Sequence, residues 1–372
     1  MKILICFGTR PEAIKMAPVI LECRNRNLQY VVCVTAQHRQ MLDQVLDWFD
    51  IVPDYDLDLM ENGQNLNNLS AKIYSALDPI LDKENPTTVL VQGDTTTALA
   101  SAMAAFHRNI PVGHIEAGLR TYNFSAPFPE EMNRQIISKI AKYHFAPTDH
   151  SRNNLIAESV SVECIQKTGN TVVDALNWSN KKISDGFEND FIQKWSDKIS
   201  TAKPWILVTA HRRENFGAGF KNLSNAILEL SEKHSCNIIW PVHPNPNVSK
   251  GLSEELKNHS SIHLIEPIDY PSMVWLMQHV SLIISDSGGI QEEAPTFGVQ
   301  VLVTRESTER PEGIEAGTST LVGMNQVKIV QNVLLKLRNS KNDVVKNPFG
   351  DGLASKRILD FLEEQFGQNS SK

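Results

Sequence analysis

The fold of this chain is decided by Ser285-Asp286-Ser287-Gly288-Gly289-Ile290-Gln291-Glu292-Glu293-Ala294-Pro295. An apolar run at 280–284 predicts a buried strand before it, and a helical pattern begins at Ile290. The residues at 287–289 have no side chain large enough to keep a ligand away from this turn. Because a helix N-terminus presents unpaired N–H groups and partial positive charge, the turn predicts a phosphate site. Glu293 follows a few residues later, and its two acceptor oxygens predict a contact with ribose hydroxyls. The alternative is that the two glycines only permit a tight turn.

Strands and helices alternate along the whole chain. Continuous apolar runs predict parallel strands that are buried on both faces, and each run leads into a helical pattern. The main strands are expected at 2–7, 30–35, 88–91, 111–115, 143–146, 205–209, 238–242, 262–265 and 301–304. The alternation predicts an α/β protein with doubly wound parallel sheets, in which ligands bind outside the carboxyl ends of the strands.

The stretch Gly169-Asn170-Thr171 marks a predicted domain boundary. The segment 181–200 is charged and less periodic, and a second α/β pattern starts at Trp205. We therefore expect an N-terminal Rossmann-like domain at 1–168, a C-terminal Rossmann-like domain at 169–351, and a last helix within 352–372 that packs back on the first domain.

Composition excludes several classes of protein. The chain has 372 residues, enough for two domains, and a net charge of −7 with both signs interspersed, which argues against nucleic-acid binding. No apolar run reaches membrane-spanning length and no signal peptide is visible, so we expect no membrane contact and a cytoplasmic location. The five cysteines are scattered without a close pair. This predicts buried free thiols in a reducing compartment rather than disulfides or a zinc site.

Charged side chains follow several of the N-terminal strands. Arg10, Asp94 and Glu116 each lie just after a strand, where a doubly wound sheet is open to ligand. Lys15 lies one turn into the first helix. The alternative for Asp94 is a helix cap, because Thr95 and two further threonines follow it.

Further candidates lie in later loops and helices. Glu130 and Arg134 are four residues apart and share a helix face, where they form either part of a site or a solvated ion pair. His211 follows a strand and precedes two arginines, and it is the best candidate for proton transfer because imidazole changes charge near neutral pH. His243 ends the next strand and is a candidate substrate contact. Arg310 pairs either with a phosphate oxygen or simply with Glu309 or Glu312.

Several motifs together carry a resemblance that covers nearly the whole chain. They are Phe7-Gly8-Thr9-Arg10-Pro11-Glu12-Ala13-Ile14-Lys15-Met16-Ala17-Pro18, Thr35-Ala36-Gln37-His38-Arg39, Gly93-Asp94-Thr95, Gly113-His114-Ile115-Glu116-Ala117-Gly118-Leu119-Arg120, Pro129-Glu130-Glu131, Gly169-Asn170-Thr171, His211-Arg212-Arg213-Glu214, the stretch 286–295 and Glu309-Arg310-Pro311-Glu312. On these motifs the chain closely resembles the non-hydrolysing UDP-N-acetylglucosamine 2-epimerases of bacteria.

The resemblance implies two Rossmann-like domains that face a central cleft in the GT-B arrangement, a homodimer, and no metal or other cofactor. It implies UDP-N-acetylglucosamine, UDP-N-acetylmannosamine and UDP as ligands. The positions matching the family's diphosphate contacts are Arg10, Ser287, Gly288, Gly289 and Arg310, and Glu293 matches the ribose contact. The positions matching its catalytic candidates are Asp94, Glu116, Glu130 and His211, with Lys15 and Arg134 in support. The positions matching a site for a second, activating substrate molecule are Gln37, Gln40 and Arg212, whereas Gly63 and Gln64 lie where some members carry an arginine.

The implied chemistry can be argued from the sugar. Carbon 2 has no carbonyl beside it in the ring, so its proton is hard to remove directly. Coupling its loss to departure of UDP from carbon 1 makes the step feasible, because a bound diphosphate is a good leaving group. The resulting 2-acetamidoglucal can be reprotonated on the other face while UDP adds back. Such an enzyme would supply the synthesis of a bacterial surface polysaccharide.

Three other functions share features of this sequence. A hydrolysing epimerase would release UDP and free N-acetylmannosamine. A retaining glycosyltransferase of the GT-B type would share the fold and the phosphate corner without needing the carboxylates at strand ends. A nucleotide-sugar sensor would bind without turnover, and the set of acid and base side chains argues against it.

Overall fold

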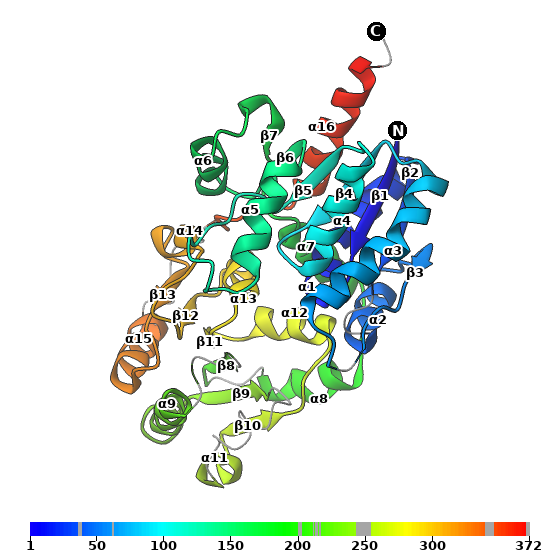
Figure 1. The fold of residues 1–372 in the computed structure, drawn as a ribbon. Helices are drawn as coiled ribbons and strands as arrows, with labels where there is room; N and C mark the ends of the chain where they lie inside the picture. The colour runs from blue at the N-terminus through cyan, green and yellow to red at the C-terminus, as the bar shows by residue number, and fades with distance from the viewer. Residues whose placement is uncertain are drawn as a thin grey trace. The chain divides into compact units, whose positions relative to one another are not determined.

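The structure is a computed structural model that describes residues 1–35, 39–61, 63–199, 203–210, 212, 215, 217–242, 254–338 and 346–369 (Figure 1). The chain divides into two compact units. The first comprises Met1–Asn177 and Phe349–Lys372, and the second comprises Trp178–Pro348. No helix in the described ranges is long and apolar enough to cross a membrane.

The first unit is built on a seven-stranded sheet in the order β3-β2-β1-β4-β5-β6-β7. All of its strand pairs are parallel. The strands are β1 (Lys2–Phe7), β2 (Gln29–Val34), β3 (Tyr55–Asp56), β4 (Thr88–Gln92), β5 (Val112–Ile115), β6 (Tyr143–Ala146) and β7 (Ile165–Lys167). The middle strands are buried along almost their whole length, as their apolar sequences predict.

Helices cover both faces of this sheet. They are α1 (Arg10–Asn25), α2 (Arg39–Trp48), α3 (Leu66–Glu84), α4 (Thr96–His107), α5 (Glu130–Ile140), α6 (Asp149–Ala157), the 3-10 turn η1 (Val162–Cys164), the first part of α7 (Thr171–Ser184) and α16 (Ala354–Asn369). Apolar side chains of α3, α4 and α5 pack with those of the central strands in one core. The C-terminal helix α16 packs against α1, and Arg26 at the C-cap of α1 donates to Glu363 of α16 at 2.6 Å.

The second unit has a six-stranded parallel sheet in the order β10-β9-β8-β11-β12-β13. Its strands are β8 (Trp205–Thr209), β9 (Asn237–Pro241), β10 (Ile262–Ile265), β11 (Leu282–Ser285), β12 (Val301–Val303) and β13 (Ser319–Leu321). Its helices are α8 (Asp190–Ile199), α9 (Ala218–His234), α11 (Glu254–Asn258), α12 (Tyr270–His279), α13 (Gly288–Glu293), the 3-10 turn η3 (Ala294–Phe297), α14 (Pro311–Glu315) and α15 (Gln326–Arg338). Helices α9 and α15 lie side by side over one core of this sheet (Figure 1).

The two sheets follow the same order of strands, except that the first has one more strand, β7, at its edge. In each sheet the fourth strand along the chain lies beside the first. The expected doubly wound α/β fold with two parallel sheets is therefore confirmed. In such sheets the carboxyl ends of the first and fourth strands form the switch point where ligands bind. This point lies between β1 and β4 in the first unit and between β8 and β11 in the second. All five cysteines are free thiols, and four of them are buried, as expected.

The helix after the glycine pair differs from the sequence prediction. It begins at Gly288 rather than at Ile290, and α13 ends already at Glu293. Proline at 295 has no backbone N–H to continue the α-helical hydrogen bonds, so the chain tightens into the turn η3. The strand before it begins at Leu282, because Val280 still donates its N–H to Leu276 at the end of α12.

Candidate active site

The loop between β1 and α1 is held by a capping box. Thr9 caps α1 by accepting a hydrogen bond from the Glu12 N–H, and Glu12 accepts the Thr9 N–H at 2.8 Å. Pro11 stands in the first turn, where its missing N–H costs nothing. Arg10 is the first residue of the helix, at the switch point of the sheet. The local sequence therefore places Arg10 where a doubly wound fold binds its ligand.

Glu12 joins this loop to the next one. Its carboxylate accepts the Gly8 N–H at 3.1 Å and the Thr95 hydroxyl at 2.6 Å, and the residue is 1% exposed. Burial raises the pKa of Glu12 to about 6, and the hydrogen bonds from Thr95, Thr9 and Gly8 offset only part of that rise. The β1–α1 loop and the β4–α4 loop are thus coupled through one buried carboxyl group.

Asp94 lies just before the N-cap of α4 and pairs with a cation of α5. The N-cap of α4 is Thr95, whose side chain accepts the Ala98 N–H at 3.0 Å, so the capping alternative for Asp94 is wrong. The Asp94 carboxylate pairs with Arg134 of α5, with Oδ2 2.8 Å from Nε and 2.7 Å from Nη2. Asn133 donates to the Asp94 carbonyl at 2.7 Å.

Glu116 follows β5 with φ = +64°, a left-handed conformation that is uncommon outside glycine. Its side chain is 9% exposed. One carboxylate oxygen, Oε1, pairs with the Lys15 ammonium and accepts the Asn170 amide at 3.1 Å. The other, Oε2, accepts the Gln92 amide. Lys15 and Glu116, two of the candidate site residues, therefore form a direct ion pair.

Glu130 is the first residue of α5. Its Oε2 atom is buried and has no hydrogen-bond partner within the part of the chain that the structure describes. The next residue, Glu131, is fully buried and accepts the backbone N–H groups of Thr121 and Tyr122 at 2.9 and 3.0 Å. Burial alone would raise the pKa of Glu131, but its donors, Arg134 among them, outweigh burial and lower that pKa. Glu131 thus anchors the loop before α5.

The second unit forms its corner between β11 and α13. Ser287 occupies the N-cap position. A Cβ atom at Gly288 would lie 2.6–2.9 Å from the Arg310 guanidinium, so this glycine lets the guanidinium pack against the start of the helix. Arg310 donates to Glu292 at 2.6 Å and to Glu309 at 2.5 Å. The contact with Glu309 is one of the pairings that the sequence left open, whereas the contact with Glu292 was not predicted.

Acidic side chains hold the cation at this corner. Burial acts to raise the pKa of Glu309, but Arg310 and Arg305 together hold that pKa far below its ordinary range. Both arginines lie within 2.8 Å of the Glu309 carboxylate. The guanidinium of Arg310 is therefore fixed beside the helix start by charge as well as by packing.

The loop after β8 is tied to the same corner. Asp286 is 0% exposed, and its Oδ2 accepts the Arg212 N–H at 2.9 Å and the Asn215 amide at 3.0 Å. Arg212, predicted from the activator resemblance, is half-buried there, and Gln40 is exposed in the first turn of α2. The candidates Gln37, His211 and His243 lie outside the described residues.

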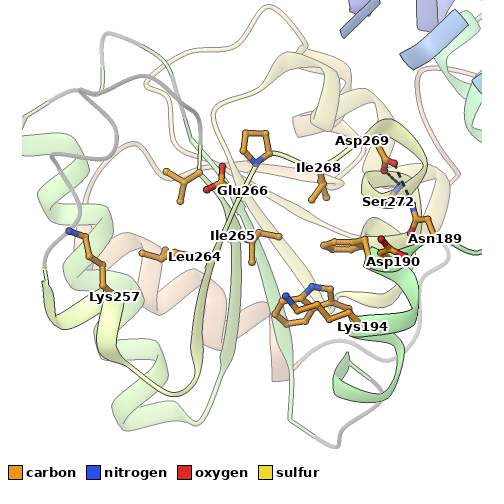
Figure 2. Close-up of a pocket in the computed structure, with 14 residues that line it drawn as sticks. Asn189, Asp190, Lys194, Lys257, Leu264, Ile265, Glu266, Ile268, Asp269 and Ser272 are labelled. Atoms are coloured by element: carbon orange, nitrogen blue, oxygen red, sulfur yellow. Dashed lines mark hydrogen bonds between the residues drawn. The ribbon is translucent and has the colours of Figure 1, made fainter. Parts of the chain in front are cut away.

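A separate pocket lies at the carboxyl end of the edge strand β10. It has a volume of about 990 Å³, and its walls include Phe191, Trp195 and the turn 266–268. Figure 2 shows Lys257 and Lys194 at opposite ends of the pocket and Asn189 beside Asp269. None of the predicted site residues that the structure describes lines it. In the sequence, only the Glu-Pro turn that ends the strand 262–265 could have indicated this pocket. Nothing in the local sequence indicated that aromatic side chains of α8 line it.

Sequence reasoning missed the neutral partners of the carboxylates. Gln92 ends β4, and Asn170 precedes α7 in the pattern of a helix cap, but neither position signals a contact with Glu116. Glu12 could have been found, since Thr-x-x-Glu is the signature of a capping box. Within the ranges that the structure describes, no cluster of His, Cys, Asp and Glu is arranged to hold a metal ion.

Two doubly wound sheets, with charged side chains at the switch point of each, define the class of Rossmann-like α/β proteins. The sequence model of the UDP-N-acetylglucosamine 2-epimerase family matches residues 21–363. The chain belongs to this family. A UDP-N-acetylglucosamine 2-epimerase of Salmonella typhimurium is 49% identical to it, over 98% of each chain.

Solved structures agree with this assignment. The Neisseria meningitidis UDP-GlcNAc 2-epimerase, bound to UDP-GlcNAc, is 47% identical with a TM-score of 0.88, over 98% of this chain and 100% of that one. The Methanocaldococcus jannaschii UDP-GlcNAc 2-epimerase, in complex with UDP-GlcNAc and UDP, is 34% identical with a TM-score of 0.84, over the same shares.

Proposed function

We propose that this chain interconverts UDP-N-acetylglucosamine and UDP-N-acetylmannosamine without net hydrolysis. The observation that carries the proposal is the carboxyl edge of β4 and β5, where Asp94 and Glu116 stand with their cationic partners Arg134 and Lys15. Acid and base side chains at a switch point are what inversion of a carbon centre in a bound nucleotide sugar requires.

The reaction proceeds by elimination and re-addition. A base takes the proton from carbon 2, the electron pair of that C–H bond forms the C1–C2 double bond, and the C1–O bond breaks with its pair going to UDP. The intermediate is 2-acetamidoglucal. An acid then returns a proton to carbon 2 on the opposite face, and a UDP oxygen re-forms the bond to carbon 1. Neither water nor an oxidant is consumed.

The first unit supplies the proton transfers in this proposal. Asp94, Glu116 and Glu130 act as acid and base groups around carbon 2, and His211 joins them on the strength of the family resemblance. Among the described residues the buried Oε2 of Glu130 has no hydrogen-bond partner, which supports a role in contact with the substrate, because a buried acceptor without a donor is costly unless a ligand supplies one. Such groups typically contribute about 10²–10⁴-fold each.

The leaving diphosphate is stabilised by cations and backbone N–H groups. We assign this role to Ser287, Gly288, Gly289 and Arg310 of the second unit and to Arg10 of the first. The packing of the Arg310 guanidinium against Gly288 supports the assignment, since it places a fixed positive charge at the glycine corner. Glu293 binds the ribose and His243 contacts the substrate in the same proposal.

The decisive experiment is incubation with UDP-N-acetylglucosamine in heavy water, followed by NMR. We expect a mixture with UDP-N-acetylmannosamine in which both sugars carry deuterium at carbon 2. Product without deuterium would indicate hydride transfer through a keto sugar. Stoichiometric free N-acetylmannosamine would indicate the hydrolysing enzyme, and bound UDP without turnover would indicate a sensor.

The phosphate corner has its own test. Ser287→Asp places an anion against the diphosphate, so UDP binding measured by calorimetry should be lost. The matched control is Ser281→Asp, which adds the same charge at an exposed position just before β11, at the opposite end of the strand. An unchanged UDP affinity in Ser287→Asp would place the diphosphate elsewhere.

Five further properties belong to the same proposal. We propose the domain limits 1–168, 169–351 and 352–372, a homodimer that ultracentrifugation would detect, and a role in supplying a surface polysaccharide. The five free thiols support a reducing, cytoplasmic location. A second substrate molecule activates the enzyme through Gln37, Gln40 and Arg212 in this proposal, and the rate should then depend sigmoidally on substrate concentration. A hyperbolic dependence would contradict such activation.

A further inference from the structure

Asn170 is a buried neighbour of Glu116 from a distant part of the chain. The residue is 3% exposed, and its Nδ2 donates to Glu116 Oε1 at 3.1 Å. Its Oδ1 accepts the backbone N–H of Val172 at 3.0 Å in the first turn of α7. One amide group therefore caps a helix with its oxygen and holds a carboxylate with its nitrogen.

The orientation of this amide is dictated by its two neighbours. A backbone N–H can only donate, so the group that faces Val172 must be the oxygen. A carboxylate can only accept, so the group that faces Glu116 must be the NH₂. Flipping the amide would set oxygen against carboxylate and leave the N–H without an acceptor, which is unfavourable on both sides.

The backbone of Asn170 is equally constrained. Its N–H donates to the Phe349 carbonyl at 2.7 Å. Gly169 has φ = +88°, and a Cβ there would lie 3.3 Å from Gly350 Cα, while a Cβ on Gly350 would lie 3.3 Å from the Asn170 nitrogen. The two glycines let the chain segments touch, so the amide is held on a rigid base.

We propose that Asn170 is a positioning residue for Glu116, which it holds in the orientation for proton transfer at carbon 2; this rests on the proposed function. The terminal torsion of a glutamate is broad, so a single ion pair to Lys15 does not fix the carboxylate plane. The hydrogen bonds from Asn170 to Oε1 and from Gln92 to Oε2 are directional, and they fix the plane of the carboxylate.

The test uses two substitutions that keep the helix cap. Serine and aspartate cap helices about as well as asparagine. Asn170→Ser is too short to reach Glu116, and Asn170→Asp turns an oxygen toward it. We expect kcat to fall about 10-fold in Asn170→Ser and about 100-fold in Asn170→Asp, with little change in KM, because a small misplacement of a catalytic group costs up to about 10²-fold in rate. The matched controls are Asn65→Ser and Asn65→Asp at the N-cap of α3, which should keep full activity.

The kinetic isotope effect separates positioning from folding. With substrate deuterated at carbon 2, the effect on kcat should grow in both Asn170 variants, because proton transfer becomes slower relative to the other steps. A loss of kcat that only follows the folded fraction, with an unchanged isotope effect, would overturn the proposal.

A crystal structure of Asn170→Ser gives a readout that needs no turnover. We expect the Glu116 carboxylate to rotate away from its wild-type position, whereas a carboxylate that stays in place would refute positioning by Asn170. Absence of epimerisation by the wild-type enzyme would refute the proposed function and leave this structural readout valid.

Discussion

Replacing Glu12 by glutamine removes a buried titrating group while keeping its shape. The glutamine oxygen can accept the N–H groups of Gly8 and Thr9, as the carboxylate does. Its NH₂ can donate to Thr95, whose hydroxyl oxygen can accept in turn. The substitution therefore isolates the effect of charge on the stability of the first unit.

The magnitude follows from the pKa of Glu12. Burial raises that pKa from its ordinary value of 4.5 to about 6, so the folded state binds the proton more tightly than the unfolded state does. The resulting stabilisation is fully present below pH 4.5 and is lost as pH rises through 6. Its size is about 2 kcal/mol, at about 1.4 kcal/mol per pKa unit.

As the pH rises from about 4.5 to about 8, we expect the free energy of unfolding of Glu12→Gln to increase by about 2 kcal/mol relative to that of the wild type. Amide hydrogen exchange in β1 and β4 measures the unfolding of this unit alone. The control is Asp47→Asn, which removes an exposed carboxylate of the same unit. If the free-energy difference between wild type and Glu12→Gln were the same at both pH values, the reasoning from burial would be wrong.

Three other substitutions test contacts in the two units. Asp174→Ala removes the acceptor for three donors at the start of α16, which should cost about 2–3 kcal/mol in urea unfolding and speed amide exchange in that helix. Gly288→Ala should cost about 1–3 kcal/mol of stability and weaken UDP binding, because its Cβ collides with Arg310. Gly289→Ala should leave the melting temperature unchanged or higher, because the nearest neighbour of its Cβ is 3.5 Å away. Equal effects of the two substitutions would contradict this packing. Arg120→Met removes a buried guanidinium from the partly exposed carboxylate of Glu158 and should cost about 1–3 kcal/mol, and an unchanged stability would refute that pairing.

The local pattern of the sequence determined the elements and the ends of the strands. Apolar runs and helix starts are written in neighbouring residues, so strands such as 143–146 and 205–209 were predicted without error. Because parallel strands end at a common edge, Arg10, Asp94 and Glu116 could be assigned to one region from the order of residues alone. The corner before Pro295 was less well predicted, since β11 begins at Leu282 rather than at Val280 and α13 begins at Gly288 rather than at Ile290.

Tertiary structure alone decided the partner of each charge. Lys15 and Glu116 are 101 residues apart, and Asn170 and Glu116 are 54 apart. They meet because β1, β4 and β5 are neighbours in the sheet, and that order depends on how helices pack across both faces. Sequence periodicity records which side chains are buried, but it carries no record of which distant element lies beside them. The candidate residues at the strand ends were therefore readable from the chain, while their ion pairs and neutral donors from distant elements were not.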